Sequence, residues 1–242
     1  MAEDELIKKH AKAAYKIFRT TDMNWTHKLK EILLEIIIIV FAVTVSIWFH
    51  NWSDRMNDRK EEKGFLISLK KDLLEDKKEM THDKDSFIQV LQGIYYFEKI
   101  GQGSVLNTDS LNQYQWCFFG SAQINPRVSR YEALKGSGKL DIVENTELLK
   151  NITDLYQKSF PLIILKNQRF NSLRENYVTP FVDSHLQLNV KGNGTNWQEI
   201  LRTSQMRLLL SQESEISDNI KAYAEGIDKI NEITKQINEE LE

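Results

Sequence analysis

One apolar run, residues 32–49, constrains this chain more than any other feature. Its eighteen residues contain a single ionisable side chain, Glu35, and the stretch from Ile36 to Phe49 carries no charge. At about 1.5 Å per residue, a helix of this length covers roughly 27 Å, close to the thickness of a bilayer's hydrocarbon core. A helix also satisfies its own backbone hydrogen bonds, which lipid cannot do. The sequence therefore predicts one transmembrane helix, residues 31–52, in contact with a lipid bilayer.

Tryptophans stand on both sides of this run. Trp25 precedes it, and Trp48 and Trp52 lie one helical turn apart at its far end. Indole rings favour the interface between membrane and water, so we assign these three residues to it. About thirty residues precede the run and no small-residue cleavage pattern follows it, which favours an uncleaved signal anchor over a removable leader.

The charge of the first thirty residues bears on orientation. Residues 1–30 hold seven lysines and arginines against four acids, whereas the whole chain has a net charge of −3. A short basic N-terminus normally stays in the cytoplasm, and long domains translocate largely regardless of charge. We therefore expect a cytoplasmic segment 1–30, amphipathic over residues 5–18 or partly ordered, with residues 53–242 across the membrane. The single Cys117 permits no intrachain disulfide and fits either compartment.

The segment after the membrane is predicted to continue as a helix. Residues 54–100 contain no proline, and apolar side chains recur at intervals of three and four in a heptad-like seam. Asp76 and Asp83 occupy two positions of this seam, which weakens its middle. We expect a stalk helix within residues 53–104, with a seam formed by Leu66, Leu69, Leu73, Met80, Phe87, Val90, Ile94 and Phe97.

The C-terminal segment, residues 191–242, has the most regular pattern. A coiled-coil-like helix is predicted to begin near Asn196, and its seam alternates steps of four and three through Thr234. The equal lengths of residues 54–100 and 196–242 favour an antiparallel hairpin, but pairing of each seam with its copy in another subunit fits the pattern too. The seam residues are Ile216, Ile220, Tyr223, Ile227, Ile230, Ile237 and Leu241.

The insert between these segments, residues 105–190, is expected to form a small helical head. Its longest helix should begin at Asn145, kink at Pro161 and end at Thr179–Pro180, because proline lacks a backbone donor and restricts the residue before it. Residues 181–190 partly alternate and favour an extended arm. The predicted fold class is mainly α: a single transmembrane helix continuing into a long helical stalk or antiparallel helical hairpin with a small helical head.

Three sets of residues resemble a bacterial family. They are Glu35-Ile36 with Asn51-Trp52 at the ends of the membrane segment, residues 65–76 after it, and residues 130–140 with 145–149 and Tyr156 in the head. Over roughly residues 30–160 the chain is similar to a family of uncharacterised single-pass inner-membrane or envelope proteins, a domain-of-unknown-function family. The family usually has a second asparagine near position 50 and often glycines in the membrane segment, and this chain has neither. The resemblance implies a bacterial inner membrane, a periplasmic C-terminal domain and no established activity.

Motifs that carry chemistry are scarce. The five histidines are scattered without metal-ligand spacing. The segment 136–139 (Gly-Ser-Gly-Lys) is not a phosphate-binding loop, because that motif requires glycine at position 133 and Ser/Thr at position 140, and the chain has Ala133 and Leu140. Cys117 lies among aromatic residues, which is typical of a buried thiol. We predict no catalytic residue, cofactor or metal site, and the lack of a basic stripe with interleaved aromatics argues against nucleic acid.

Three function classes follow. The favoured one is a non-enzymatic envelope scaffold or tether that self-associates through its helical seams as a homo-oligomer. The second is an accessory subunit of an ion- or transport-coupled complex, in which Glu35 contacts a polytopic membrane partner, since a carboxylate in a membrane helix is costly and often functional. A structural role for Glu35 near the headgroups is the alternative. The third class is an extracytoplasmic sensor, weakened by the short cytoplasmic segment.

Overall fold

The computed structural model describes residues 2–19 and 25–242. This part of the chain is 84% helical and contains no β-strand beyond one isolated bridge between Leu188 and Gly194, so the expected mainly α fold is confirmed. The chain divides into two compact units, Met1–Glu61 and Glu62–Glu242, which are described separately.

The first unit holds helix α1, Ala2–Arg19, and the beginning of helix α2, Trp25–Gly101. No glycine or proline occurs between residues 25 and 63, so nothing in that stretch interrupts the helix. Its most apolar eighteen-residue window has none of its residues buried, and the helix is long and apolar enough to cross a membrane. The hydroxyl of Thr44 donates to the carbonyl of Val40 at 2.7 Å, which satisfies the hydroxyl inside the helix.

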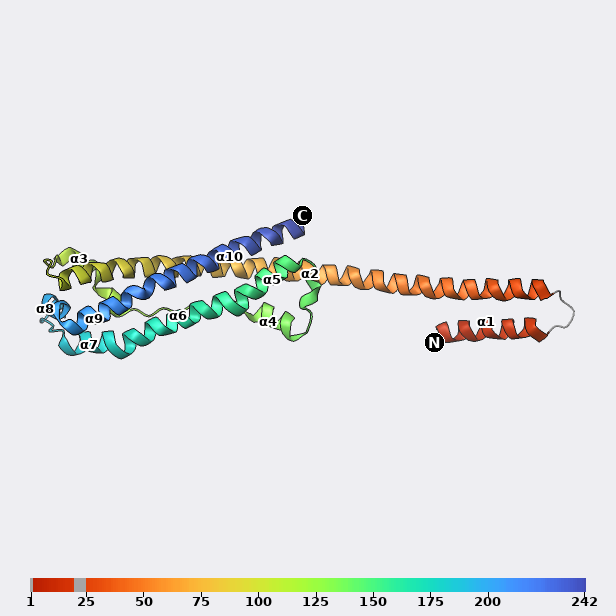
Figure 1. Ribbon diagram of the computed structural model, residues 1–242, viewed down its shortest axis with the longest axis horizontal. Coiled ribbons are helices and arrows are strands. Elements are labelled where there is room, and N and C mark those ends of the chain that lie inside the picture. The colour runs from red at the N-terminus through yellow and green to blue at the C-terminus, as the bar shows by residue number, and fades with distance from the viewer. Residues whose placement is uncertain (1, 20–24) are drawn as a thin grey trace. The chain divides into compact units, whose positions relative to one another are not determined.

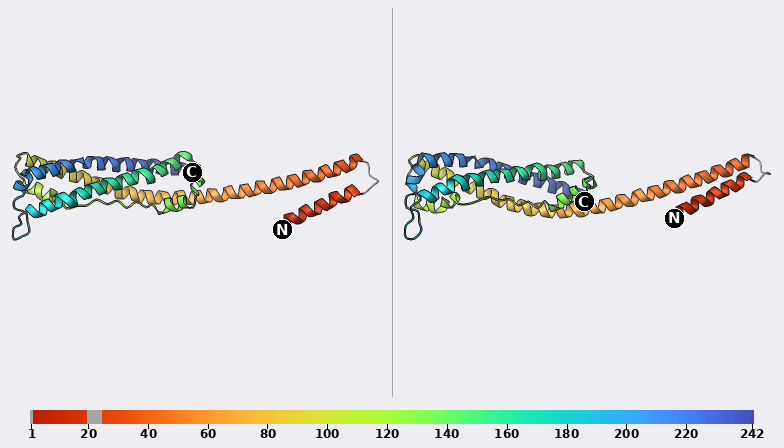
Figure 2. Two further views of the ribbon diagram at one scale, coloured as in Figure 1. Left: turned by 60° about the horizontal axis from the view of Figure 1, so that its bottom comes forward. Right: turned by 90° about the horizontal axis from the view of Figure 1, so that it is seen from below.

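The second unit is built from three long helical stretches that lie side by side (Figures 1 and 2). They are the later part of α2, the stretch Thr146–His185, and α10, Ser217–Leu241. α10 runs antiparallel to α2, because Lys70 donates to Asn238 at 2.6 Å near one end while Tyr223 lies 3.4 Å from Asp83 nearer the other. The hairpin alternative is therefore the arrangement that the structure contains.

The insert supplies the third long stretch of this bundle. It consists of α5, Thr146–Asp154, α6, Phe160–Leu173, and α7, Thr179–His185, and it packs along the hairpin as well as at its end. Asn167 donates to the hydroxyl of Tyr223 at 2.8 Å, and the rings of Phe87 and Phe170 meet edge to face at 5.3 Å. The expected head is thus largely a bundle helix, because its apolar face is long enough to cover both seams.

Two π-turns carry this stretch past its prolines. The amide of Phe160 donates to the carbonyl of Leu155, five residues back, and Pro161 follows. The second π-turn, Arg174–Val178, places Pro180 in the first turn of α7 in the same way. A π-turn locally widens the helix, because its backbone hydrogen bonds join residues five apart instead of four. The proline ring therefore does not clash with a backbone carbonyl of the preceding turn. The predicted end at Thr179–Pro180 is therefore wrong, and residues 181–185 are helical rather than extended.

Shorter helices connect the long ones. The predicted continuous helix from Asn196 is wrong, because Thr203 has an extended backbone and its side chain caps the next helix by accepting from Met206. The remaining elements are α3, Thr108–Tyr114, capped by Asn107; η1, Gln115–Phe118; α4, Ser129–Gly136; η2, Leu140–Ile142; α8, Trp197–Arg202; α9, Ser204–Glu213; and η5, Ser214–Ile216.

Three helices of the bundle lie close together at Gly226 of α10. A Cβ atom built there would lie 2.7 Å from Cε of Met80 and 3.1 Å from Cδ1 of Ile163. The missing side chain therefore lets α10 lie against both α2 and α6. Gly64 of α2 is the opposite case, since a Cβ atom there would meet nothing within 4 Å.

Candidate functional site: the apolar segment and the charged clusters of the bundle

The far end of the apolar segment carries an exposed aromatic group. Trp48 and Trp52 are 62% and 54% exposed, and Phe49 lies between them with edge-to-face ring contacts of 5.3 and 6.4 Å. Large exposed indoles suit a membrane interface. The side chain of Trp25 lies outside the described residues, so its interfacial assignment, like that of the other two, stays a prediction.

Glu35 has an in-chain neighbour that the sequence did not indicate. Nδ1 of His10, on α1, lies 3.5 Å from Oε1 of Glu35, and the glutamate side chain is 16% exposed. Its second oxygen, Oε2, is buried and has no hydrogen-bond partner among the described residues. A buried carboxylate oxygen without a donor is unfavourable, so Glu35 remains able to accept one more hydrogen bond.

The C-terminal seam is covered within one chain. Tyr223 contacts the ring of Phe87, and α10 packs against α2, α5 and α6. The predicted seam missed Ile233, which is buried, because the regular spacing assigned the half-buried Thr234 instead. Ile220 and Leu241 are partly buried, and the buried seam residues are Ile216, Tyr223, Ile227, Ile230 and Ile237.

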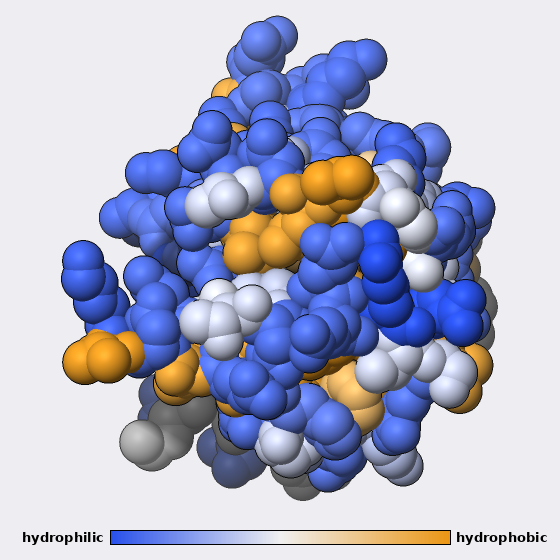
Figure 3. All heavy atoms as spheres, turned by 90° about the vertical axis from the view of Figure 1, so that its left-hand side faces the viewer, coloured by the Kyte–Doolittle hydropathy of each residue, from blue (hydrophilic) through white to orange (hydrophobic). Residues whose placement is uncertain are grey.

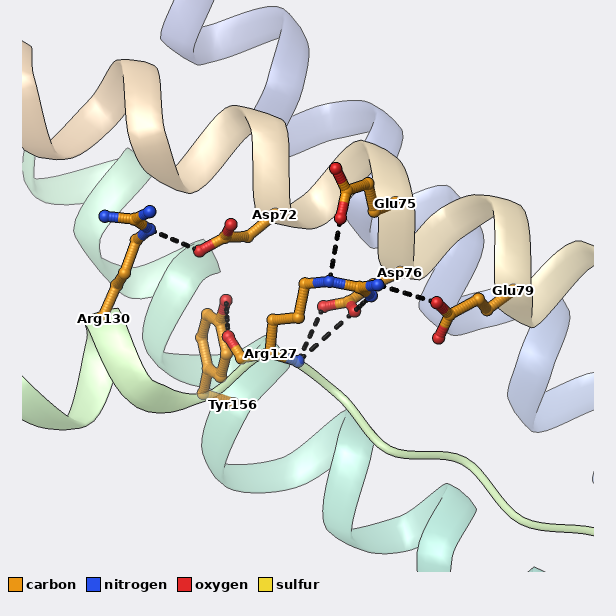
Figure 4. Close-up of polar contacts among 7 residues, drawn as sticks. All are labelled: Asp72, Glu75, Asp76, Glu79, Arg127, Arg130 and Tyr156. Carbon is orange, nitrogen blue, oxygen red and sulfur yellow. Dashed lines mark hydrogen bonds and ion pairs between the residues drawn. The ribbon is translucent and has the colours of Figure 1, made fainter.

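A carboxylate cluster on α2 holds Arg127 (Figure 4). The guanidinium lies 3.0 Å from Glu75, 2.7 Å from Asp76 and 2.8 Å from Glu79, and the backbone amide of Arg127 also donates to Asp76. Asp76 is 2% exposed, so burial raises the pKa of its carboxyl group while its hydrogen bonds with Arg127 oppose that rise. We call these four residues the Arg127 clasp.

The Arg127 clasp fixes the extended segment before α4 against α2. Beside it, Arg130 pairs with Asp72 at 2.6 Å, and the hydroxyl of Tyr156 donates to the carbonyl of Arg127 at 3.4 Å. The sequence signal for this cluster was Asp76 itself, because an acid at a seam position needs a buried partner. Arg127 is 51 residues away, and no local pattern identifies it.

A second ion pair is fully enclosed at the other end of the bundle. Nε of Arg174 lies 2.7 Å from Oε1 of Glu213, with side chains 3% and 0% exposed. Nη1 donates to the carbonyl of Gly120 at 2.8 Å, and the guanidinium lies 4.0 Å from the ring centre of Phe170. Burial raises the pKa of the Glu213 carboxyl group, and Arg174 opposes this rise.

The thiol near this pair is inert in the folded chain. Cys117 is fully buried, and burial raises the pKa of its thiol to about 12. A Cβ atom on Gly93 would lie 3.0 Å from its sulfur, so α2 lies close against it. This environment agrees with the buried thiol that the sequence indicates, because reactivity requires an exposed thiolate.

The surface of the bundle offers shallow openings. One of about 340 Å³ lies between α2 and α6 and is lined by residues that include Asp83, Trp116, Phe170 and Arg174. The end of the unit near α3, α8 and α9 is mostly hydrophilic, with a small apolar patch at its centre (Figure 3). Across residues 2–19 and 25–242, no group of three or more histidine, cysteine or acidic side chains is arranged to hold a metal ion.

Comparison of the chain with protein-family models, with curated proteins and with solved structures found no match.

Proposed function

We propose that this chain is a non-enzymatic, membrane-anchored scaffold of the bacterial envelope. The observation that carries the proposal is the unburied apolar segment 32–49 of α2, in a helix that is long and apolar enough to cross a membrane. Between Leu66 and Ile100, the same helix supplies one buried apolar face of a three-helix bundle. An anchor and a folded binding body thus share one helix, which is what a tether requires.

The finer parts of this proposal concern location. The apolar segment sits in the inner membrane as a single-pass anchor, with residues 1–30 in the cytoplasm and the bundle in the periplasm. The basic character of residues 1–30 and the resemblance to an envelope family support this orientation. We do not assign self-association to the Ile216–Leu241 seam, because its side chains are already covered inside one chain. A homo-oligomer would use another surface.

Membrane fractionation tests the anchor. The intact chain should stay in the pellet after cell lysis, high-speed centrifugation and an alkaline wash. Val43→Arg places a charge near the centre of the segment at a cost of about 2.5–3.5 kcal/mol, so a large share of this variant should move to the supernatant. Val105→Arg is the matched control, since Val105 is exposed outside the segment. Recovery of the unmodified chain in the supernatant would refute the proposal.

Thiol labelling tests the orientation. In a Cys117→Ser background, single cysteines replace exposed Lys12 of α1 and exposed Gln205 of α9. A membrane-impermeant maleimide added to spheroplasts should label the Gln205→Cys variant and should reach the Lys12→Cys variant only after the membrane is opened. The reverse pattern would place the bundle in the cytoplasm.

A second candidate function is a subunit of an ion- or transport-coupled complex. The observation that favours it is Glu35, whose Oε2 atom is buried without a hydrogen-bond partner in the described part of the chain, with His10 3.5 Å from the other oxygen. Such a group can accept a hydrogen bond from a basic side chain of a polytopic partner. Site-specific photo-crosslinking at Ile36 should then recover a polytopic protein, and Glu35→Gln should reduce that yield. An unchanged yield with Glu35→Gln would exclude this role for the carboxylate.

A further inference from the structure

One face of α2 in the second unit combines an apolar row with uncompensated positive charge. Ile67, Leu74, Ile88 and Tyr95 are 57%, 46%, 36% and 48% exposed, and Thr81 occupies the remaining position of this seven-residue repeat. In a helix, residues seven apart lie on the same side. The row therefore forms a continuous strip roughly 42 Å long, distinct from the buried seam of the same helix.

Lysines border this row on both sides. On the surface of a helix, each row member has neighbours three and four positions before it and after it. Six of these neighbouring positions between residues 63 and 85 are lysines. Asp85 is the one acid among these neighbours between residues 63 and 90. We call the row and its lysines the lysine stripe. Its lysines are Lys63, Lys70, Lys71, Lys77, Lys78 and Lys84.

In the described part of the chain, the lysines of the stripe lack the ion pairs that hold the acids on the other side of α2. Within the described residues none of the six forms an ion pair, and the ammonium of Lys70 donates to the neutral amide of Asn238. By contrast, Arg127 holds the three acids of the Arg127 clasp, and Arg130 pairs with Asp72.

We propose that the lysine stripe docks an acidic helix of a partner protein, one that carries apolar residues at seven-residue spacing. The proposal rests on the scaffold function above and names the class of partner that the scaffold holds. A partner that binds this face must carry anionic groups to complement the charge of the lysines, which form no ion pair with any described residue of a chain that is acidic overall. The apolar row supplies the contact, because a seven-residue repeat matches a second helix wound around the first.

Two other occupants fit the same face less well. A second copy of this chain paired through the lysine stripe would bring lysines against lysines in either direction, which opposes pairing. An anionic bilayer would neutralise the lysines, but a flat surface does not require apolar residues at a seven-residue period, which drifts around a straight helix. An acidic helix satisfies both the charge and the period.

Binding of designed peptides to the full chain in a neutral detergent tests the proposal. The probe is a labelled 28-residue helical peptide with leucine at the seam positions of each heptad and glutamate beside them, and its counterpart has lysine in place of glutamate. By fluorescence anisotropy the glutamate peptide should bind and weaken as salt is added, whereas the lysine peptide should not bind. Equal binding of both peptides would overturn the proposal.

Matched variants assign the binding to this face. Lys71→Gln with Lys78→Gln should weaken binding by about tenfold, since two exposed ion pairs are lost. Lys221→Gln with Lys235→Gln removes the same charge from exposed positions of α10 and should change binding less than about twofold. An equal loss from both pairs would mean general charge attraction and would overturn the proposal.

The apolar row has its own matched pair. Leu74→Gln with Ile88→Gln should weaken binding by at least about tenfold, because each change removes apolar contact area. Leu162→Gln with Leu165→Gln changes two leucines of α6 with similar exposure and should have no effect. Protection of Cys117 from thiol reagents verifies that each variant is folded. Binding that tolerates the first pair would overturn the proposal.

Two further measurements identify a different occupant. In a Cys117→Ser background, efficient disulfide formation between copies through Thr81→Cys, without binding of the glutamate peptide, would assign the face to a second copy. Co-sedimentation with phosphatidylglycerol vesicles but no peptide binding would assign it to a lipid surface. Either result overturns the acidic-helix proposal. Fractionation reports separately on the scaffold, since a soluble chain that still binds the peptide would refute the anchor alone.

Discussion

The enclosed pair of Arg174 and Glu213 permits a quantitative test of what holds the bundle together. Both side chains are almost fully buried, and Arg174 also donates to the carbonyl of Gly120. Arg174→Met leaves the glutamate buried without its cation, which should destabilise the bundle by about 3–5 kcal/mol. Replacing both members, with Arg174→Met and Glu213→Leu, removes both charges, so this double variant should lie within about 1–2 kcal/mol of the original chain.

Cys117 provides the assay. Its thiol is buried in the folded chain, so a thiol reagent reacts only when the bundle opens, and the labelling rate measures the population of open molecules. A loss of about 3–5 kcal/mol should accelerate labelling by roughly 10²- to 10³-fold or more, since each 1.4 kcal/mol is a factor of ten. Labelling is done on the full chain in a mild detergent at fixed reagent concentration.

A matched pair of exposed residues is the control. Lys221 and Glu225 of α10 lie 3.9 Å apart with side chains 75% and 63% exposed, so replacing both should change the labelling rate by no more than a few-fold. The reasoning is wrong if Arg174→Met labels at the rate of the original chain. Glu213→Leu alone completes the comparison. The reasoning is also wrong if the loss of stability in the double variant equals the sum of the losses in the two single variants, because the two charges would then not be coupled.

The remaining predictions use the same labelling assay or urea unfolding. Gly226→Val should destabilise the bundle by about 1–3 kcal/mol, because the added atoms meet side chains of α2 and α6, whereas Gly64→Ala should stabilise the exposed helix by about 0.5–1 kcal/mol. Arg127→Ala should destabilise the bundle by about 2–4 kcal/mol, because it leaves Asp76 buried without its cation. An effect below about 0.5 kcal/mol would show that the Arg127 clasp does not stabilise the bundle. Burial raises the pKa of the Asp83 carboxyl group above its ordinary value, because burial disfavours the charged form. The charged carboxylate therefore destabilises the bundle at a pH above its folded-state pKa, and this destabilisation disappears as the pH falls below that pKa. Asp83→Asn should therefore raise the urea midpoint near pH 7 and lose this advantage toward pH 4, and a constant difference would refute the assignment.

The sequence was most informative where structure depends on neighbouring residues. The helix over 54–100 follows from the absence of proline, and Asn145 caps α5 by accepting from Glu147 and Leu148, as its position indicates. The repeat from Tyr223 to Ile237 marks the buried face of α10. These features depend on helix periodicity and capping chemistry within a few residues, so one sequence contains the information needed.

The features that the sequence missed depend on distant contacts. The end predicted at Thr179–Pro180 failed because a π-turn admits the proline, and the break at Thr203 carries no Gly or Pro signal. Partners such as Arg127 for Asp76 and Arg174 for Glu213 are separated by 51 and 39 residues. Many acids and arginines are available in the chain, so spacing alone cannot select the pairs that meet.

The antiparallel return of α10 has a consequence for how the chain is made. The helix that completes the bundle leaves the ribosome after both α2 and α6, yet it covers apolar side chains of both. Until α10 has emerged, those two apolar faces stay uncovered, so the nascent bundle cannot close segment by segment and depends on protection from aggregation in the interval. A premature stop before residue 217 would therefore leave a fragment with exposed apolar helix faces, which is a target for proteolysis rather than a smaller folded protein.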